Sequence, residues 1–337
     1  MSRTTKQVLL AARPAGLPKE SDFRVAEAPV PAVADGEVLV RTIYLSVDPY
    51  MRGRMRETRS YANPVEIGQV MFGGTVGQVE ESRNGYFQPG DYVEGYLGWQ
   101  TYAISGGKGL RKLDPRLAPL STALGVLGMP GLTAYFGVTE ICKPKPGETM
   151  AVSGAAGAVG SLAGQIGKIL GSRVIGTAGS DAKVKWITDE LGFDGGLNYK
   201  SVPDHKKELG RLCPQGIDTY FDNTGGPVTD AVLMLINPFA RIALCGQISQ
   251  YNQEKPEMGP RLLFQLVIRQ ALMQGFLVFQ YADSYEEGRS QMLQWLTEGK
   301  LKYREQFSEG IESASQAFIS MLQGGNTGKQ LVRVSHE

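Results

Sequence analysis

The 337 residues carry 35 basic and 34 acidic side chains, so the net charge gives no reason to expect nucleic acid or anionic lipid as a partner. With 42% hydrophobic residues the chain can bury a sizeable core, but its length makes one single core unusual, and we expect two domains. The three cysteines, Cys142, Cys213 and Cys245, are widely spaced without a CxxC pair, which argues against a disulfide framework and indicates a reducing compartment.

The chain begins MSRTTKQVLLAARPAG, where the apolar run is only a few residues long and is soon followed by arginine. Such a run is too short for a signal peptide or a membrane span, so we expect a cytoplasmic protein. Residues 1–123 contain short apolar strands, such as 37–46 and 74–80, separated by Gly, Pro and Asp. This pattern predicts a β-rich, barrel-like domain.

The pattern changes near residue 124, where the apolar, glycine-rich stretch 124–137 predicts a buried helix beginning near Pro130. From there strands and helices alternate, which favours a parallel, doubly wound sheet over residues 124–299. The expected strands are 149–153, 173–177, 196–199, 217–222, 241–245 and 274–278, and the clearest helices are 159–170 and 181–191.

The C-terminal part of the chain predicts a helix at 285–298, an apolar helical segment at 311–322 and a last strand at 329–334. We expect residues from about 300 to 337 to fold back onto the N-terminal domain. The α/β domain would then be an insertion in the β-rich one.

The most informative stretch, residues 152–160, lies between an expected strand and an expected helix. Ala155, Gly157 and Gly160 occupy the three glycine positions of the dinucleotide fingerprint G-x-G-x-x-G. Small residues there let the backbone approach a pyrophosphate, while the N–H groups of the helix start face the anion. The alternative is a tight turn needed only for packing the helix against the strand.

The end of the second strand distinguishes NAD from NADP, because an acidic side chain there would repel a 2′-phosphate. Residues 176–180 contain no Asp or Glu, and Ser180 and Lys183 provide a hydroxyl donor and a cation close to a helix start. This favours NADPH. Asp181 argues mildly against it, and Lys183 is alternatively a solvated helix lysine.

The chain as a whole resembles the medium-chain dehydrogenase/reductase superfamily. Within it, the resemblance is to the zinc-independent branch of prostaglandin reductases, plant double-bond reductases and bacterial NADPH-dependent curcumin reductases. The matching stretches are 45–55, 128–135, 153–161, 221–226 and 245–252, and the segments 48–55 and 97–100 are most similar to the curcumin reductases.

The resemblance implies a GroES-like N-terminal domain joined to a Rossmann domain, usually in a homodimer. The cofactor contacts that the resemblance implies are Thr133, Ala156, Gly157, Ala158, Val159, Lys183, Tyr199, Asn223, Cys245, Phe276, Leu277, Val278 and Asn326. For two of them another role is open: Asn223 is alternatively a simple turn residue, and Cys245 an inert small core residue.

A catalytic metal is not expected, because zinc needs three or four Cys, His or carboxylate ligands and the only histidines, His205 and His336, lie near no cysteine in the sequence. Reduction of an electron-poor alkene needs a hydride on the β-carbon, charge stabilisation at the carbonyl oxygen and a proton at the α-carbon. A tyrosine hydroxyl is then the natural donor. Tyr251 is the first candidate, with packing at the domain junction as its alternative.

Tyr50 is the second candidate donor, because the resemblance implies that its segment lies beside the substrate. Arg52 and Arg54 would fix a polar substrate or hold this loop through ion pairs, and Tyr61 would line the mouth of the site.

The function expected from the sequence is NADPH-dependent reduction of the carbon–carbon double bond of an enone or enal. One alternative is an NADPH:quinone reductase of the same superfamily, and another is a cofactor-binding protein without turnover. An alcohol dehydrogenase is disfavoured by the missing zinc ligands.

Overall fold

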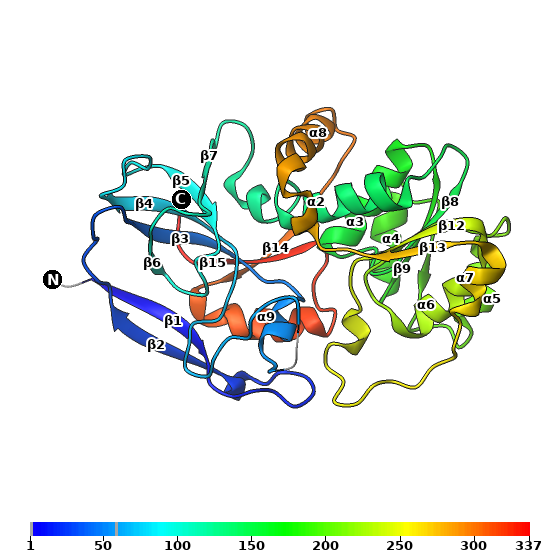
Figure 1. The fold of residues 1–337 in the computed structure, drawn as a ribbon, viewed down its shortest axis with the longest axis horizontal. Coiled ribbons are helices and arrows are strands. Elements are labelled where there is room, and N and C mark those ends of the chain that lie inside the picture. Colours follow the sequence, from blue (N-terminus) through cyan, green and yellow to red (C-terminus); the bar gives the residue numbers. More distant parts are fainter. Residues whose placement is uncertain (1–2, 58–59) are drawn as a thin grey trace. The chain divides into compact units, whose positions relative to one another are not determined.

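The computed structural model describes residues 3–57 and 60–337. The chain forms two compact units (Figure 1). Unit 1 consists of residues 1–125 and 305–337, and unit 2 of residues 126–304. No helix in the described ranges is both long and apolar enough to cross a membrane.

Unit 1 is built mainly of β-sheet. Its larger sheet has the strand order β14-β15-β3-β4-β5-β7, β6 pairs with β3, and β1 and β2 form a separate antiparallel pair. The elements are β1 (Thr4–Leu10), β2 (Phe23–Pro29), β3 (Val38–Ser46), α1 (Met51–Arg54), β4 (Thr75–Ser82), β5 (Tyr92–Gly95), β6 (Tyr102–Ser105), β7 (Arg111–Leu113), β14 (Glu305–Glu309), α9 (Ala314–Leu322) and β15 (Lys329–Arg333).

Two interactions join distant segments inside unit 1. Trp99 is fully buried between Phe23 and Phe318, each with its ring centroid 5.9 Å away, so α9 contributes to the core. Lys329 of β15 is buried and donates to Asp48 over 3.1 Å and to the carbonyl of Val47 over 2.9 Å. This ion pair fixes the loop after β3, which carries Tyr50.

Unit 2 contains a six-stranded sheet of order β10-β9-β8-β11-β12-β13 in which every pairing is parallel. Counted along the unit, this is the order 3-2-1-4-5-6 of a doubly wound dinucleotide-binding fold. The strands are β8 (Thr149–Val152), β9 (Arg173–Ala178), β10 (Gly195–Asn198), β11 (Ile217–Asp222), β12 (Ile236–Leu244) and β13 (Leu272–Gly275). The helices are α2 (Met129–Phe136), α3 (Ala158–Ile169), α4 (Asp181–Asp189), α5 (His205–Leu212), α6 (Gly226–Leu233), α7 (Phe264–Arg269) and α8 (Tyr285–Thr297).

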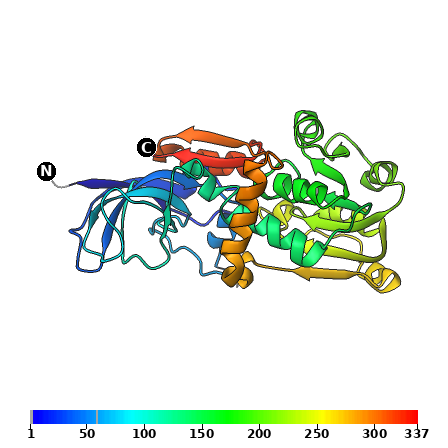
Figure 2. The same cartoon turned by 90° about the horizontal axis from the view of Figure 1, so that it is seen from above.

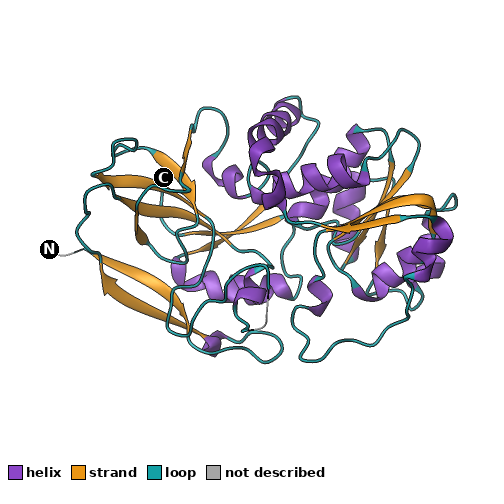
Figure 3. Cartoon of the chain, in the orientation of Figure 1, coloured by secondary structure: helices purple, strands orange, loops and turns teal. Residues whose placement is uncertain are grey.

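The strands of unit 2 send alternate side chains into two cores, because successive residues of a strand point to opposite faces. Met150 and Val152 of β8 belong to a core shared with α2, α3 and α4, whereas Ala151 between them belongs to a core shared with α5, α6 and α7. Helices accordingly lie on both sides of the sheet (Figure 3). The mixed α/β fold expected from the sequence is confirmed.

Two strand boundaries expected from the sequence are wrong. The last strand of the sheet ends at Gly275, not at residue 278, because Phe276 and Val278 are buried in side-chain clusters that include residues of α2. Their alternating pattern reflects this packing, and the N–H of Phe276 makes one last hydrogen bond, of 3.4 Å, to the Leu244 carbonyl of β12. Strand β12 starts at Ile236, earlier than expected, and continues past Phe239, which has a φ of 63°.

Candidate functional site

The strand order of unit 2 reverses direction between β8 and β11, and ligands of open parallel sheets bind at the carboxyl ends of such strands. The chain leaves β8 at Ser153 and leaves β11 at Asn223, so both residues lie at this switch point. The Asn223 side-chain amide donates to the carbonyl oxygen of Ser153 over 2.7 Å. The loops after the two strands are therefore in direct contact.

The turn after β8 has the conformation of an anion cradle. Gly154 has a φ of 59°, and the N–H of Gly157 donates to the Gly154 carbonyl over 3.0 Å. Helix α3 then starts at Ala158, and no side chain of the described residues caps its N-terminus at Gly157. The first N–H groups of a 12-residue helix are thus oriented for an anionic ligand, with the positive end of the helix dipole behind them.

Close packing explains which positions of this turn must be small. A Cβ on Gly160 would lie 2.3 Å from the Gly154 carbonyl oxygen, and a Cβ on Gly176 of β9 would lie 2.7 Å from Cβ of Ala155. The positive φ is required at Gly154, one residue before the first fingerprint position, which explains why alanine is tolerated at 155. Sequence reasoning missed Gly154, although a glycine directly before the matched triplet was a usable signal.

The end of β9 gathers donors and cations. Ser180 caps α4, its hydroxyl oxygen accepting from the N–H of Lys183 over 3.3 Å. A Cβ added at Gly179 would lie 3.2 Å from the Tyr199 hydroxyl and 3.4 Å from Cε of Lys200. Burial, and then repulsion from Lys200, lowers the pKa of Lys183. Two lysines close enough to repel each other fit a dianionic phosphate as their common partner.

The acid that argued against this assignment, Asp181, accepts a 2.8 Å hydrogen bond from Asn198 of β10. Its carboxylate is therefore engaged at the start of α4. Sequence reasoning missed Lys200, because its proximity to Lys183 depends on where β10 ends.

The remaining cofactor residues expected in unit 2 lie at or near the carboxyl ends of β12 and β13, or on α2. Burial, and then Asp222, raises the pKa of Cys245 to about 12, so this residue is a thiol at neutral pH. Phe276 and Val278 are buried, whereas Leu277 is more exposed. Thr133 is buried in α2 and donates to the Met129 carbonyl over 2.7 Å.

Tyr251 follows β12 and lies at the same edge of the sheet as Asn223. Its hydroxyl accepts from the N–H of Gln247 over 3.3 Å and lies 3.0 Å from the position of a Cβ on Gly246. Burial is the main reason that the pKa of Tyr251 is raised. The phenol therefore keeps its proton at neutral pH and can act as a hydrogen-bond donor.

In unit 1, Tyr50 directly precedes α1. Its hydroxyl is buried without a hydrogen-bond partner among residues 3–57 and 60–337. Burial, and then the Asp48 carboxylate, raises the pKa of Tyr50 well above its ordinary value. Tyr61 and Tyr96 raise that pKa further, so these phenols lie near one another.

The two arginines beside Tyr50 have different surroundings. Arg54 lies with its guanidinium 3.8 Å above the ring of Phe72, and its Nη1 donates to the Asn63 carbonyl. Arg52 is buried, and its Nη2 donates to the carbonyls of Pro14 and Gly16 over 3.2 and 2.8 Å. These contacts favour the alternative in which Arg52 holds its loop in place, here through hydrogen bonds to backbone carbonyls.

Two further residues of unit 1 were expected at the site: Tyr61 at its mouth and Asn326 against the cofactor. Tyr61 is 57% exposed. Asn326 donates over 2.8 Å to the carbonyl of Gly328 in its own loop.

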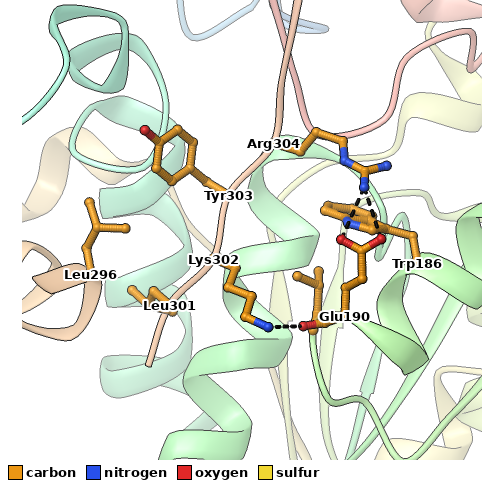
Figure 4. A pocket seen from close by; sticks show the side chains of 8 residues that line it. Trp186, Glu190, Leu296, Leu301, Lys302, Tyr303 and Arg304 are labelled. Atoms are coloured by element: carbon orange, nitrogen blue, oxygen red, sulfur yellow. Dashed lines mark hydrogen bonds and ion pairs between the residues drawn. The ribbon is translucent and has the colours of Figure 1, made fainter. Parts of the chain in front are cut away.

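A cavity of about 320 Å³ in unit 2 lies away from these residues (Figure 4). Arg304 lies over the Trp186 ring and 3.2 Å from both oxygens of Glu190, and Lys302 donates to the Glu190 carbonyl. The cavity is at the C-terminal end of α4, whereas Ser180 and Lys183 are at its N-terminal end. It is therefore separate from the expected nucleotide site.

Two family models match the chain: an N-terminal domain of oxidoreductases over residues 6–113 and a zinc-binding dehydrogenase over residues 158–298. Despite the second description, no group of three or more His, Cys, Asp or Glu side chains in the described part of the chain could hold a metal ion.

Similar proteins cover almost the whole chain. The NADPH-dependent curcumin reductase of Escherichia coli (strain K12) is 47% identical, covering 97% of this chain and 96% of the relative. The NADP(+)-dependent 2-alkenal reductase of Nicotiana tabacum is 44% identical, covering 99% and 98%. The crystal structure of CurA from Vibrio vulnificus in complex with NADPH has a TM-score of 0.95 at 47% identity, covering 98% of this chain and 100% of that one. The chain therefore belongs to the zinc-independent branch of the medium-chain dehydrogenase/reductase family that includes the curcumin reductases.

Proposed function

We propose that this protein uses NADPH to reduce the carbon–carbon double bond of α,β-unsaturated ketones or aldehydes. The observation that carries the proposal is the uncapped start of α3 behind the Gly154 turn, together with Lys183 and Lys200, which follow β9 and β10. This set of donors and cations fits a pyrophosphate and a 2′-phosphate. The similarity to curcumin and 2-alkenal reductases supports an enone or enal as the acceptor.

The residues of unit 2 would bind and orient the dinucleotide. The N–H groups of Ala158 and its neighbours would hold the pyrophosphate, and Ser180, Lys183 and Tyr199 the adenosine phosphate. Asn223 and Cys245, at the carboxyl ends of β11 and β12, would lie along the remainder of the cofactor. NADPH, when bound there, supplies the hydride for the β-carbon of the substrate.

Tyr251 and Tyr50 are the proposed proton-bearing groups. Both phenols have raised pKa values, so each remains a donor at neutral pH and can stabilise negative charge on a substrate carbonyl oxygen. The Tyr50 hydroxyl has the stronger need for a partner, because buried polar groups are normally hydrogen-bonded and this one has no partner within the described residues. Arg54 and Tyr61 would line the substrate side of unit 1.

We also propose that the protein is a homodimer that associates through the edge of the unit 2 sheet. Strand β13 ends the strand order, and with α7 it lies along the outer margin of unit 2 (Figure 2). An unpaired edge beside exposed apolar side chains is suited to antiparallel pairing with the same strand of a second copy. The exposed apolar residues are Leu263, Phe264, Val267, Ile268 and Leu272, each more than half exposed.

Light scattering on a size-exclusion column tests the dimer. Wild-type protein should have twice the mass of the chain, and Val267→Glu should shift it towards the monomer. A monomeric wild type would contradict the proposed dimer.

The near-balanced charge and the three free cysteines support a cytoplasmic enzyme without a nucleic-acid partner.

The deciding experiment for the function is product identification after reaction with NADPH and a panel of enones, enals and quinones. A saturated ketone or aldehyde is the expected product. Hydroquinones formed without any saturated carbonyl product would identify a quinone reductase, and no NADPH oxidation with any acceptor would identify a protein without turnover.

A further inference from the structure

The last residue of β11, Asp222, is a fully buried carboxylate. It forms no ion pair with any residue that the structure describes. Burying a carboxylate without a cation is costly unless hydrogen-bond donors surround it. The identity of those donors therefore indicates what the carboxylate holds together.

Among the residues that the structure describes, five donors surround Asp222. These hydrogen bonds, together with the N-terminus of α6, stabilise the buried carboxylate in place of a cation. Its Oδ1 accepts from Ser153 Oγ over 2.8 Å and from the Tyr220 hydroxyl and the N–H groups of Thr224 and Gly225 over 2.9 Å each, and its Oδ2 accepts from Thr229 Oγ1 over 2.7 Å.

Ser153 connects this carboxylate to both loops of the switch point. Its Oγ donates to Asp222 and accepts from the N–H groups of Asn223 and Thr224 over 2.9 and 3.2 Å. Its carbonyl accepts from the Asn223 side chain. A Cβ on the following residue, Gly154, would lie only 3.3 Å from Cβ of Asn223, so the loops are already at their closest approach.

Thr229 approaches the same carboxylate from α6. Its hydroxyl donates to Asp222 and its oxygen lies 2.9 Å from the Tyr220 hydroxyl oxygen, both partners being on β11. Neither contact involves the turn at residues 154–157 or Asn223. Thr229 and Ser153 each give one hydroxyl to one carboxylate, but only Ser153 lies in a loop of the switch point. The chain thus provides a matched pair for comparison.

We propose that Asp222 is a positioning residue that fixes the spacing between the glycine turn and Asn223 through Ser153, and that this spacing sets the affinity for NADPH. The inference rests on the proposed function, because it assumes that the two loops hold the dinucleotide. Asp222 itself is fully buried and acts on the two loops through its hydrogen bond with the Ser153 hydroxyl.

The test compares Ser153→Ala with Thr229→Val in the full-length protein without bound cofactor. NADPH Kd is measured by fluorescence titration, and Tm is measured on the same samples. Loss of a hydrogen bond to a charged group should raise the NADPH Kd of Ser153→Ala about tenfold or more, whereas the Kd of Thr229→Val should stay within about twofold of wild type. Both variants should have a lower Tm than wild type, since each removes one donor from the same buried carboxylate, and Ser153→Ala should lose at least as much as Thr229→Val because its hydroxyl also accepts from the N–H groups of Asn223 and Thr224.

Steady-state kinetics provides the second readout. In Ser153→Ala the KM for NADPH should rise with the Kd, while the KM for the enone should not. Equal Kd values for the two variants, whether changed or unchanged, would overturn the positioning role. A wild-type protein that fails to bind NADPH would instead overturn the proposed function, so the two failures are distinguishable.

Discussion

Replacing Gly157 by alanine separates a nucleotide cradle from a turn that serves only packing. The backbone at Gly157 has a φ of −87°, which any residue adopts. A Cβ there would meet the Gly154 carbonyl oxygen at 3.3 Å and nothing else within 4 Å. We therefore expect a small change in the free energy of unfolding, within about 0.5 kcal/mol.

Gly160→Ala is the matched contrast. Its Cβ would lie 2.3 Å from the Gly154 oxygen and 3.0 Å from Cα of Ala155, both backbone atoms that cannot rotate away. Overpacking of this kind costs about 1–3 kcal/mol, against a helix-propensity gain of at most about 1 kcal/mol for alanine over glycine. With the full propensity gain, the net loss of up to about 2 kcal/mol corresponds to a Tm lower by up to roughly 8 °C for a domain of this size.

Thermal unfolding without cofactor and fluorescence titration with NADPH measure the two effects. Gly157→Ala should unfold like wild type but bind NADPH at least about tenfold more weakly, because its methyl group occupies the surface that the pyrophosphate approaches. Gly160→Ala should lose stability before any ligand is added. If Gly157→Ala bound NADPH as wild type does, the turn would serve packing alone and the cofactor assignment would be refuted.

Four further predictions concern single groups. Lys183→Glu should narrow or invert the preference for NADPH over NADH, measured as the ratio of kcat/KM values, and an unchanged ratio would remove Lys183 from the phosphate site. Because Lys183 must be charged to hold the phosphate and its pKa is lowered, NADPH affinity should be full below that lowered pKa and fall as the pH rises through it, before the ordinary lysine range, while NADH affinity stays constant. Tyr251→Phe should lower kcat with little change in NADPH Kd; unaltered turnover would leave Tyr50 as the donor. Lys329→Met should destabilise unit 1 by about 3–5 kcal/mol, because Asp48 remains buried without its cation, and urea unfolding should show partial recovery when Asp48→Asn is added.

The fold of unit 2 could be predicted because its signals are local. Buried parallel strands appear as short apolar runs, and strand 217–222 was predicted with its observed bounds, Ile217–Asp222. The prediction failed where burial continues beyond the end of a strand, as at Phe276 and Val278, which are buried although β13 ends at Gly275. Periodicity records that a side chain is buried, not which element covers it.

The candidate site was only partly predictable. The fingerprint located the turn but not the residue that needs a positive φ, because Gly154 lies outside the matched triplet. The role of Arg52 in an ion pair or against substrate stays a prediction, but the sequence did not indicate that its Nη2 donates to the carbonyls of residues 14 and 16, a long-range contact that is not encoded locally. The role of Asp222 was missed for the same reason, since its donors Ser153 and Thr229 belong to separate segments.

The most direct test of the hydride chemistry uses NADPH with deuterium at both C4 positions of the nicotinamide and an enone acceptor, with NMR analysis of the product. Reduction of the double bond predicts one deuterium on the β-carbon of a saturated ketone and a solvent proton on the α-carbon. Deuterium on the carbonyl carbon of an allylic alcohol, or no deuterium in the product, would contradict it.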